Sequence, residues 1–452
     1  MRPASLPRCL AIASLAAPAL LALTTSAHAI EFKIEAQTVG DAYQLVTSDN
    51  AILNRNRLHQ YLGLSAFDTN EDGQTHWSFT SLLRFDADFG LTQAEQDRIT
   101  GAGVDTAQLS LQYAWLDGRE LLGGLLDLRL GRQMLADGLD YLMFDGATVT
   151  INTPAHFAVE LMAGSEVKNE MSGLNASQLQ LDGTRFMEST ETSIDKPTIA
   201  FGAALETRDL GTGRYRLGYR RYWSDGAVDA EKVGGSFQQK IGSAVNLTGI
   251  LSYDLFNAQF DRIQAGGRVR VADHTEIDLE YVRTVPSFEG DSIFNFFSTY
   301  PMNDLNLRWR LYPGDNDRIY AGGKVGLAGN EGYKGDVLYG DVDTMVVGWG
   351  AMAGWSHFFG QKGIDGRLMV DVSFDGGYAG DRFLADVGGV WAVVPGEWEL
   401  EGRVTTTAFD DAIQGELHAT SFGYQLGGRY LIDKKAAFAV VAEHNLNRIE
   451  TS

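Results

Sequence analysis

Apolar and polar residues alternate along many short stretches of this chain. The stretch NDLNLRWRLYP (303–313) puts its large apolar residues on one parity, namely Leu305, Leu307, Trp309 and Leu311. The other parity carries Arg308 and Arg310. The same period occurs in residues 76–89, 106–115, 213–223, 274–282, 366–374 and 397–405. A period of two is typical of a β-strand with two unlike faces, so we expect about twenty strands, from residues 32–46 to residues 438–448.

Two all-β architectures give this alternation. A soluble sandwich buries the apolar face and exposes the polar one, whereas an outer-membrane barrel turns the apolar face to lipid and the polar face to its lumen. Short turn-like segments occur at 152–156, 209–213, 313–316, 394–397 and 433–436, and longer polar stretches at 165–197, 224–230, 285–301 and 329–343. Tryptophans lie mostly near strand ends, at Trp77, Trp115, Trp223, Trp309, Trp355, Trp391 and Trp398. These features favour an all-β fold with a single transmembrane antiparallel β-barrel of about 18–22 strands, short periplasmic turns and long extracellular loops.

The two ends of the chain bear on the export of the protein and on the closure of the predicted barrel. Residues 1–29 have a basic start, a short apolar run and the sequence Ala27-His28-Ala29, which together predict a signal peptide and export to the outer membrane. The barrel domain is then 30–452, and the only cysteine, Cys9, leaves with the signal. The final residues, NRIETS, lack the aromatic end expected of a closing strand, and strand numbers should be even. Either a strand is miscounted, or the closing C-terminal strand is missing.

Composition and motifs exclude several functions. The formal charge of −22 argues against a nucleic-acid partner, which requires a basic surface. Beyond the signal, no apolar run is long enough for a transmembrane helix; one short helix is expected at 91–99. The histidines show no zinc spacing, and neither a nucleophile elbow nor a phosphate-binding loop occurs. We therefore expect no enzyme activity, no cofactor and no metal.

Charged residues fall on the polar parity of several predicted strands. An acidic strand with Glu276, Asp278 and Glu280 follows the basic pair Arg268 and Arg270, and precedes the basic pair Arg308 and Arg310. Further candidates for the pore lining are Arg84, Asp127, Arg129, Arg216 and Arg220. Two interpretations stay open. The charges can select solutes across the lumen, or they can form a lattice of ion pairs that only balances charge.

The stretch ELLGGLLDLRLGRQ (120–133), followed by FDGATVTINTP (144–154), resembles the porin-like outer-membrane proteins of Gram-negative bacteria, and is similar to the alginate-export and related substrate-specific porin families. The resemblance implies passive diffusion of small hydrophilic or charged solutes, in contact with outer-membrane lipid and lipopolysaccharide. It also implies a constriction at 134–143, with Asp137, Asp140 and Tyr141 as candidates, or in the loop 165–197. Arg132 falls on the other parity, where it anchors the loop or faces lipid headgroups. The oligomeric state stays open.

Two alternatives to a channel remain. The first is a barrel closed by its loops, with a structural or adhesive role, and the Phe-rich stretch 287–301 is a candidate plug that we expect to pack inward. The second is a soluble secreted β-protein.

Overall fold

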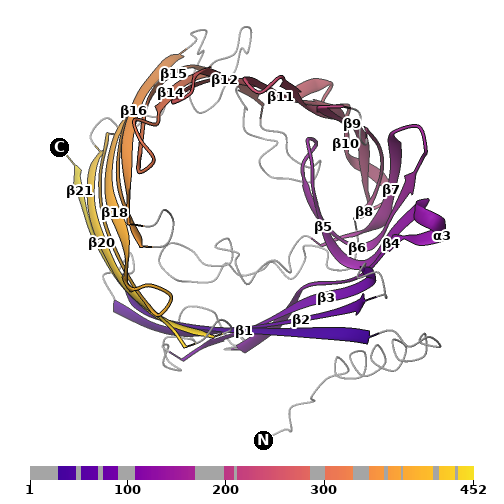
Figure 1. Cartoon of the computed structure of the whole chain (residues 1–452), viewed down its shortest axis with the longest axis horizontal. Coiled ribbons are helices and arrows are strands. Elements are labelled where there is room, and N and C mark those ends of the chain that lie inside the picture. Colours follow the sequence, from indigo (N-terminus) through magenta and orange to yellow (C-terminus); the bar gives the residue numbers. More distant parts are fainter. Residues whose placement is uncertain are drawn as a thin grey trace, which may run out of the picture. The chain divides into compact units, whose positions relative to one another are not determined.

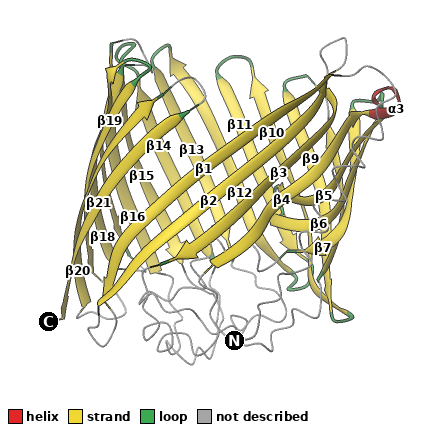
Figure 2. Ribbon diagram, turned by 90° about the horizontal axis from the view of Figure 1, so that it is seen from below, coloured by secondary structure: helices red, strands yellow, loops and turns green. Residues whose placement is uncertain are grey.

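The computed structural model describes residues 29–46, 52–69, 75–89, 107–167, 198–207, 211–285, 301–328, 346–360, 365–377, 380–410, 417–432 and 436–451. Nearly all of these residues lie in twenty-one β-strands, and consecutive strands pair antiparallel over residues 29–166 and over residues 227–451 (Figure 2). The expected class, an all-β chain of 18–22 antiparallel strands, is confirmed. No helix among the described residues has the length and apolar character needed to span a membrane.

The chain divides into two compact units. Figure 1 labels their strands and colours them along the sequence. The first contains residues 1–203 and 223–226. Its strands are β1 (Ala29–Val46), β2 (Ile52–Thr69), β3 (Thr75–Asp88), β4 (Ala107–Glu120), β5 (Leu126–Ala136), β6 (Tyr141–Asn152) and β7 (Phe157–Glu166), with the short element α3 (Leu121–Gly124) between β4 and β5. Strand β8 (Ile199–Thr207) contributes to both units, as does β9 (Gly213–Ser224), whose last two residues belong to the first unit.

The second unit contains residues 204–222 and 227–452. Its strands are β9 (Gly213–Ser224), β10 (Ala227–Ile241), β11 (Val245–Asp254), β12 (Gln259–Ala272), β13 (Thr275–Thr284), β14 (Met302–Leu311), β15 (Asp317–Ala328), β16 (Val346–Phe359), β17 (Gly366–Gly376), β18 (Asp381–Val394), β19 (Trp398–Asp410), β20 (Leu417–Leu431) and β21 (Ala437–Thr451).

Within the second unit, connections alternate between short turns and segments of varied length. The turns after β10, β12, β14 and β18 are all short, as expected for 313–316 and 394–397. The long connections after β13 and β15 both occur at the opposite strand ends. The expected long loop at 224–230 is wrong, because β9 and β10 meet in a tight turn at Asp225 and Gly226, which both have positive φ.

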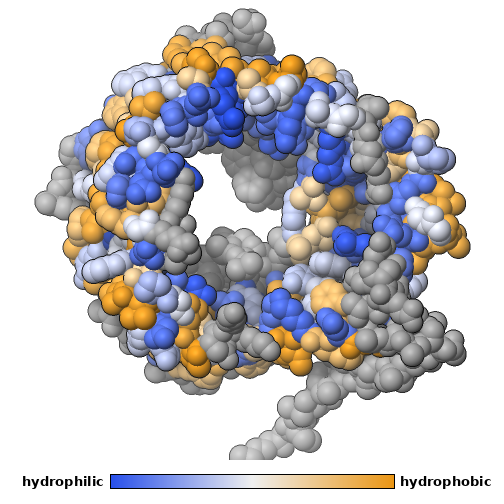
Figure 3. All heavy atoms as spheres, viewed as in Figure 1, coloured by the Kyte–Doolittle hydropathy of each residue, from blue (hydrophilic) through white to orange (hydrophobic). Residues whose placement is uncertain are grey.

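The two faces of each sheet differ in polarity and in exposure. Large apolar side chains are exposed on one face: on β14, Leu305 is 48% exposed and Leu307 51%. The buried set includes many polar groups, among them Arg84, Gln133, Arg220, Ser252 and Asp254. Figure 3 shows hydrophobic and hydrophilic residues gathered on opposite sides of the strands. This distribution is the reverse of a soluble sandwich, in which the apolar face is buried.

Several expected features lie outside the described residues. They are the signal peptide apart from Ala29, the helix at 91–99, the loop 165–197 from residue 168 to residue 197, the Phe-rich stretch 287–301 apart from Pro301, and the loop 329–343.

Candidate functional site on a charged sheet face

The register of β12, β13 and β14 brings the predicted charges together. Asp278 of β13 lies opposite Arg268 on one side and opposite Arg308 on the other. Glu276 likewise lies between Arg270 and Arg310. Because directly opposed residues of an antiparallel pair point to the same face, the expected acidic strand between two basic ones forms one continuous charged surface.

Asp278 is the centre of this surface. Its Oδ1 accepts a hydrogen bond of 2.6 Å from Arg268 Nε, and its Oδ2 lies 2.7 Å from Arg310 Nη1. The carboxylate therefore pairs with one arginine directly across the ladder and with a second on the diagonal. The contact with Arg268 is a short charge-assisted hydrogen bond, whereas the contact with Arg310 is an ion pair without hydrogen-bond geometry.

The other two acids of β13 also have partners. Glu276 Oε1 lies 3.7 Å from Arg270 Nη2, and its Oε2 accepts a hydrogen bond of 3.2 Å from the Tyr312 hydroxyl. Burial, with the nearby Glu276 carboxylate, raises the pKa of the Tyr312 phenol, so the phenol stays a neutral donor. Glu280 accepts a hydrogen bond from Gln264 of β12.

Arg308 differs from Arg310 although the two are adjacent on the same face of β14. Its guanidinium contacts the Sδ of Met352 at 3.2 Å and lies 5.4 Å from the centre of the Tyr320 ring. Neither contact supplies a carboxylate. Of the two arginines grouped by the sequence, Arg310 makes an ion pair, and Arg308 makes none with the residues that the structure describes.

A pocket of about 330 Å³ opens beside this surface, between β14 and β17. Its polar lining includes Arg310, Tyr312, Arg318, Tyr320 and Asp371. Tyr320 donates a hydrogen bond to Asp371. The sequence reasoning missed Tyr320 and Arg318, although both fall on the polar parity of β15.

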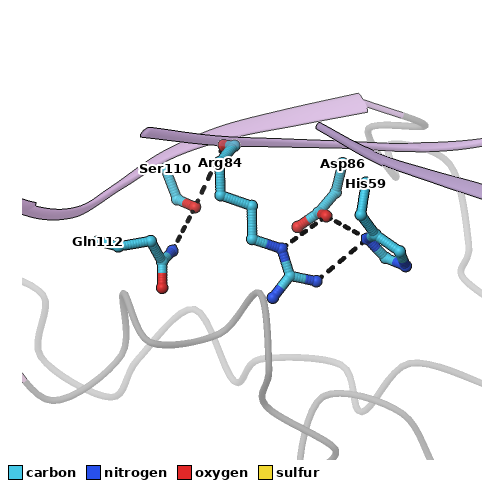
Figure 4. A network of polar contacts seen from close by, with 5 residues as sticks. All are labelled: His59, Arg84, Asp86, Ser110 and Gln112. Carbon is cyan, nitrogen blue, oxygen red and sulfur yellow. Dashed lines mark hydrogen bonds and ion pairs between the residues drawn. The ribbon is translucent and has the colours of Figure 1, made fainter. Parts of the chain in front are cut away.

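A second polar cluster occupies β2, β3 and β4 of the first unit (Figure 4). Arg84 is only 3% exposed; its Nε donates to Asp86 Oδ1 at 2.7 Å, and its Nη2 lies 3.1 Å from His59 Nδ1. His59 also contacts Asp86. Ser110 donates to the Arg84 carbonyl oxygen and accepts from Gln112. The sequence predicted Arg84 alone, although the alternating parity puts Asp86 on the same face.

A β-bulge changes which residues of β4 lie on the same face of the sheet as Asp117. The β3–β4 register shifts between Leu82 and Leu83, so the parity of β4 reverses along its length. Trp115 and Asp117 then share a face with Arg129, whose guanidinium lies 5.3 Å from the Trp115 ring and 3.4 Å from Asp117 Oδ2. Trp115, which was expected near a strand end, lies within β4 beside a charged pair.

Asp127 is at the β4–β5 connection. It accepts hydrogen bonds from the Glu120 amide at 2.8 Å and from Asn152 Nδ2 at 3.0 Å. These contacts fix the connection, whose backbone has positive φ at Leu122 and Gly123. Asp127 thus holds strand ends together.

Arg132 contacts neighbouring strands through its guanidinium. It makes two hydrogen bonds to Asp145 of β6, at 2.8 and 2.7 Å, and donates a third to the Leu111 carbonyl oxygen of β4. Of the two expectations for Arg132, an anchoring role agrees with these contacts.

Residues 134–143 form the end of the β5–β6 hairpin and not a separate loop. Asp137 Oδ1 accepts hydrogen bonds from the amides of Leu139 and Asp140, which closes the four-residue turn. Tyr141 is the first residue of β6 and is half exposed. The hydrogen bonds within the turn account for the position of the Asp137 side chain without any contact with a solute.

Arg216 and Arg220 lie on β9 of the second unit. Arg216 Nη1 contacts Glu206 Oε2 at 3.2 Å, and Arg214 also pairs with Glu206. Arg220 is 1% exposed. Within the described part of the chain, no group of three or more His, Cys, Asp or Glu residues is placed to hold a metal ion.

No protein-family model matches the chain, and no curated protein matches it in sequence. Among solved structures, the chain is similar to the outer membrane protein OpdK of Pseudomonas aeruginosa, with 11% identity, a TM-score of 0.41 and coverage of 83% of this chain and 98% of that one. It is also similar to OccAB2 of Acinetobacter baumannii, with 9% identity, a TM-score of 0.42 and 93% coverage of each chain. A mutant of the Rh. blastica porin gives 11% identity, a TM-score of 0.33 and coverage of 80% and 99%.

Proposed function

We propose that the strands close into one outer-membrane β-barrel, through which small hydrophilic or charged solutes diffuse passively. Residues 1–29 act as the export signal and residues 30–452 form the barrel. The charged faces of β3, β5, β9, β12, β13 and β14 line the passage. The apolar faces contact outer-membrane lipid and lipopolysaccharide.

The exposure of the apolar face carries this proposal. A soluble protein rarely exposes an apolar patch larger than a few hundred Å², yet this chain exposes large apolar side chains in strand after strand of both units. The hydrocarbon of a bilayer is a favourable environment for that surface, and the backbone groups of paired strands such as β13, β14 and β15 are hydrogen-bonded along their ladders. A soluble secreted β-protein of this sequence would have to cover the same surface.

The opposite face supports a water-filled passage. Its arginines and acids pair across the strands and keep part of their surface exposed, as with Arg268 and Arg310. Charges of this kind tolerate a wet lumen and would be costly against lipid. The described strands number twenty-one, which is odd, so both alternatives for the closing strand remain part of the proposal.

Reconstitution tests the function and the alternatives together. The protein is refolded in detergent, checked for heat-modifiable mobility on a gel, and added to planar bilayers. The proposal predicts a folded, heat-modifiable form and discrete conductance steps. A folded form without conductance would favour the loop-closed structural barrel, and a protein with no heat-modifiable form would favour the soluble one.

A further inference from the structure

Arg308 and Arg310 are neighbours on the same face of β14, and they have different partners. All three acids of the adjacent strand β13 are engaged by other groups: Asp278 by Arg268 and Arg310, Glu276 by Arg270 and Tyr312, and Glu280 by Gln264. Arg308 lies directly opposite Asp278 in the register. Because both Asp278 oxygens already have partners, the guanidinium of Arg308 turns to the other neighbouring strand.

The glycine at position 322 leaves room for the Arg308 side chain to extend toward β15 and β16. Arg308 lies opposite Gly322 of β15, and Gly322 lies opposite Met352 of β16. The guanidinium reaches across Gly322 to the Met352 sulfur. A Cβ at Gly322 would lie 2.7 Å from the Leu307 carbonyl oxygen and 3.3 Å from Met352 Cγ. Because residue 322 is a glycine, the Arg308 side chain has room to lie over the backbone of β15.

Tyr320 and Met352 hold the guanidinium of Arg308 without neutralising its charge. The Tyr320 ring, 5.4 Å away, attracts the cation through its π face and leaves the charge in place. A thioether sulfur is a weak acceptor, so the described part of the chain leaves most of the five N–H donors of Arg308 available to water or to a solute. An ion pair, by contrast, already occupies Arg310.

We propose that Arg308 is a selectivity-determining residue of the channel, whereas Arg310 belongs to the ion-pair lattice. This inference rests on the proposed function. Arg308 attracts anions to this part of the wall and repels cations, since no carboxylate of the described strands balances its positive charge. At about 6 Å in water, with screening at about 0.1 M salt, a unit positive charge stabilises an anion and destabilises a cation enough to change the anion-to-cation permeability ratio roughly threefold.

Reversal potentials across a salt gradient test the assignment. We expect Arg308→Gln to lower the anion-to-cation permeability ratio about two- to threefold and Arg308→Lys to keep it near the wild-type value. The matched control is Arg283→Gln on β13. By its register with Ile263 and Asn303, Arg283 lies on the apolar face, so the same charge is removed from the other side of the sheet. The control should leave the ratio unchanged.

A second variant covers the case in which Arg308→Gln does not fold. Arg308→Cys places a thiol on this face in a chain whose only other cysteine, Cys9, lies in the predicted signal. A cationic methanethiosulfonate should restore the wild-type ratio, and an anionic one should lower it further.

The outcomes distinguish a failure of the proposed channel function from a failure of the role proposed for Arg308. A wild-type protein that folds but does not conduct would contradict the proposed function. A conducting protein whose ratio is the same in Arg308→Gln, or shifts equally in Arg283→Gln, would overturn the role of Arg308 and leave the channel standing.

Discussion

Tyr320 on β15 donates a hydrogen bond to Asp371 on β17, although β16 lies between the two strands. The side chain crosses above Gly354, where a Cβ would approach Tyr320 Cε1 and Asp371 Oδ1 at 2.3 Å each. Lys324 of β15 reaches Asp375 of β17 at 2.6 Å in the same way, above Gly350. Glycine on the middle strand thus lets long polar side chains lie flat along the sheet.

Gly354→Ala should break the contact between Tyr320 and Asp371. The added methyl displaces the ring, and we expect a loss of about 1–3 kcal/mol in stability from overpacking and an unmade hydrogen bond. Urea titration of the heat-modifiable form measures the change. Gly40→Ala is the control, since a Cβ there has no atom within 4 Å; equal losses in the two variants would contradict the crossing.

The two arginines on Asp278 should be coupled. Either Arg268→Gln or Arg310→Gln alone leaves the carboxylate one cationic partner, whereas the double variant leaves none. We expect the double variant to lose about 1 kcal/mol more stability than the sum of the single ones. A strictly additive cycle would show that Asp278 does not bridge them. The exposed pair Lys33 and Glu35 supplies a reference cycle, where the coupling should be close to zero.

Asp86→Asn should be more damaging than most substitutions on this sheet face. Asp86 is the carboxylate that contacts both Arg84 and His59, and Arg84 is almost fully buried. Removing one partner of a buried pair costs about 3–5 kcal/mol, since the remaining charge lacks compensation. The comparison is Glu399→Gln, which removes the half-buried partner of the exposed Arg429 and should cost less than about 1 kcal/mol. Similar unfolding midpoints for the two variants would argue against the network.

Tryptophan fluorescence can test the effect of the β4 bulge. Trp309 lies on the apolar face of β14 and is 40% exposed, whereas Trp115 lies beside Arg129 and Asp117. In brominated lipid, Trp309→Phe should remove part of the quenched signal, and Trp115→Phe should leave that part intact. Loss of quenched signal in Trp115→Phe would place this residue against lipid, as the unbroken alternation in the sequence suggested.

The sequence predicted the strands well because alternation is a local property. The stretch 303–313 shows both faces of β14, and the pairing of Glu276 and Asp278 with flanking arginines followed from adjacent strands. Which arginine pairs with each acid was not predictable, because it depends on how far each side chain extends diagonally toward the neighbouring strand. The bulge at Leu82 and Leu83 was also missed, since one extra residue reverses parity without any marked change in composition.

The contacts of Asp127 and Asp137 show a second limit. Both are polar residues near strand ends, where a sequence does not distinguish a side chain that lines a passage from one that closes a turn. The hydrogen bonds to backbone amides assign both to turns. Asp140 and Tyr141 remain candidates for narrowing the passage.

Accessibility along β14 tests the central claim most directly, namely that one face of the strands meets lipid and the other lines an aqueous passage. Single cysteines at positions 305 to 310 are introduced into the protein, reconstituted in vesicles and exposed to a membrane-impermeant thiol reagent. The account predicts labelling at Asn306, Arg308 and Arg310 and protection at Leu305, Leu307 and Trp309. Uniform labelling, or labelling on the apolar parity alone, would contradict it.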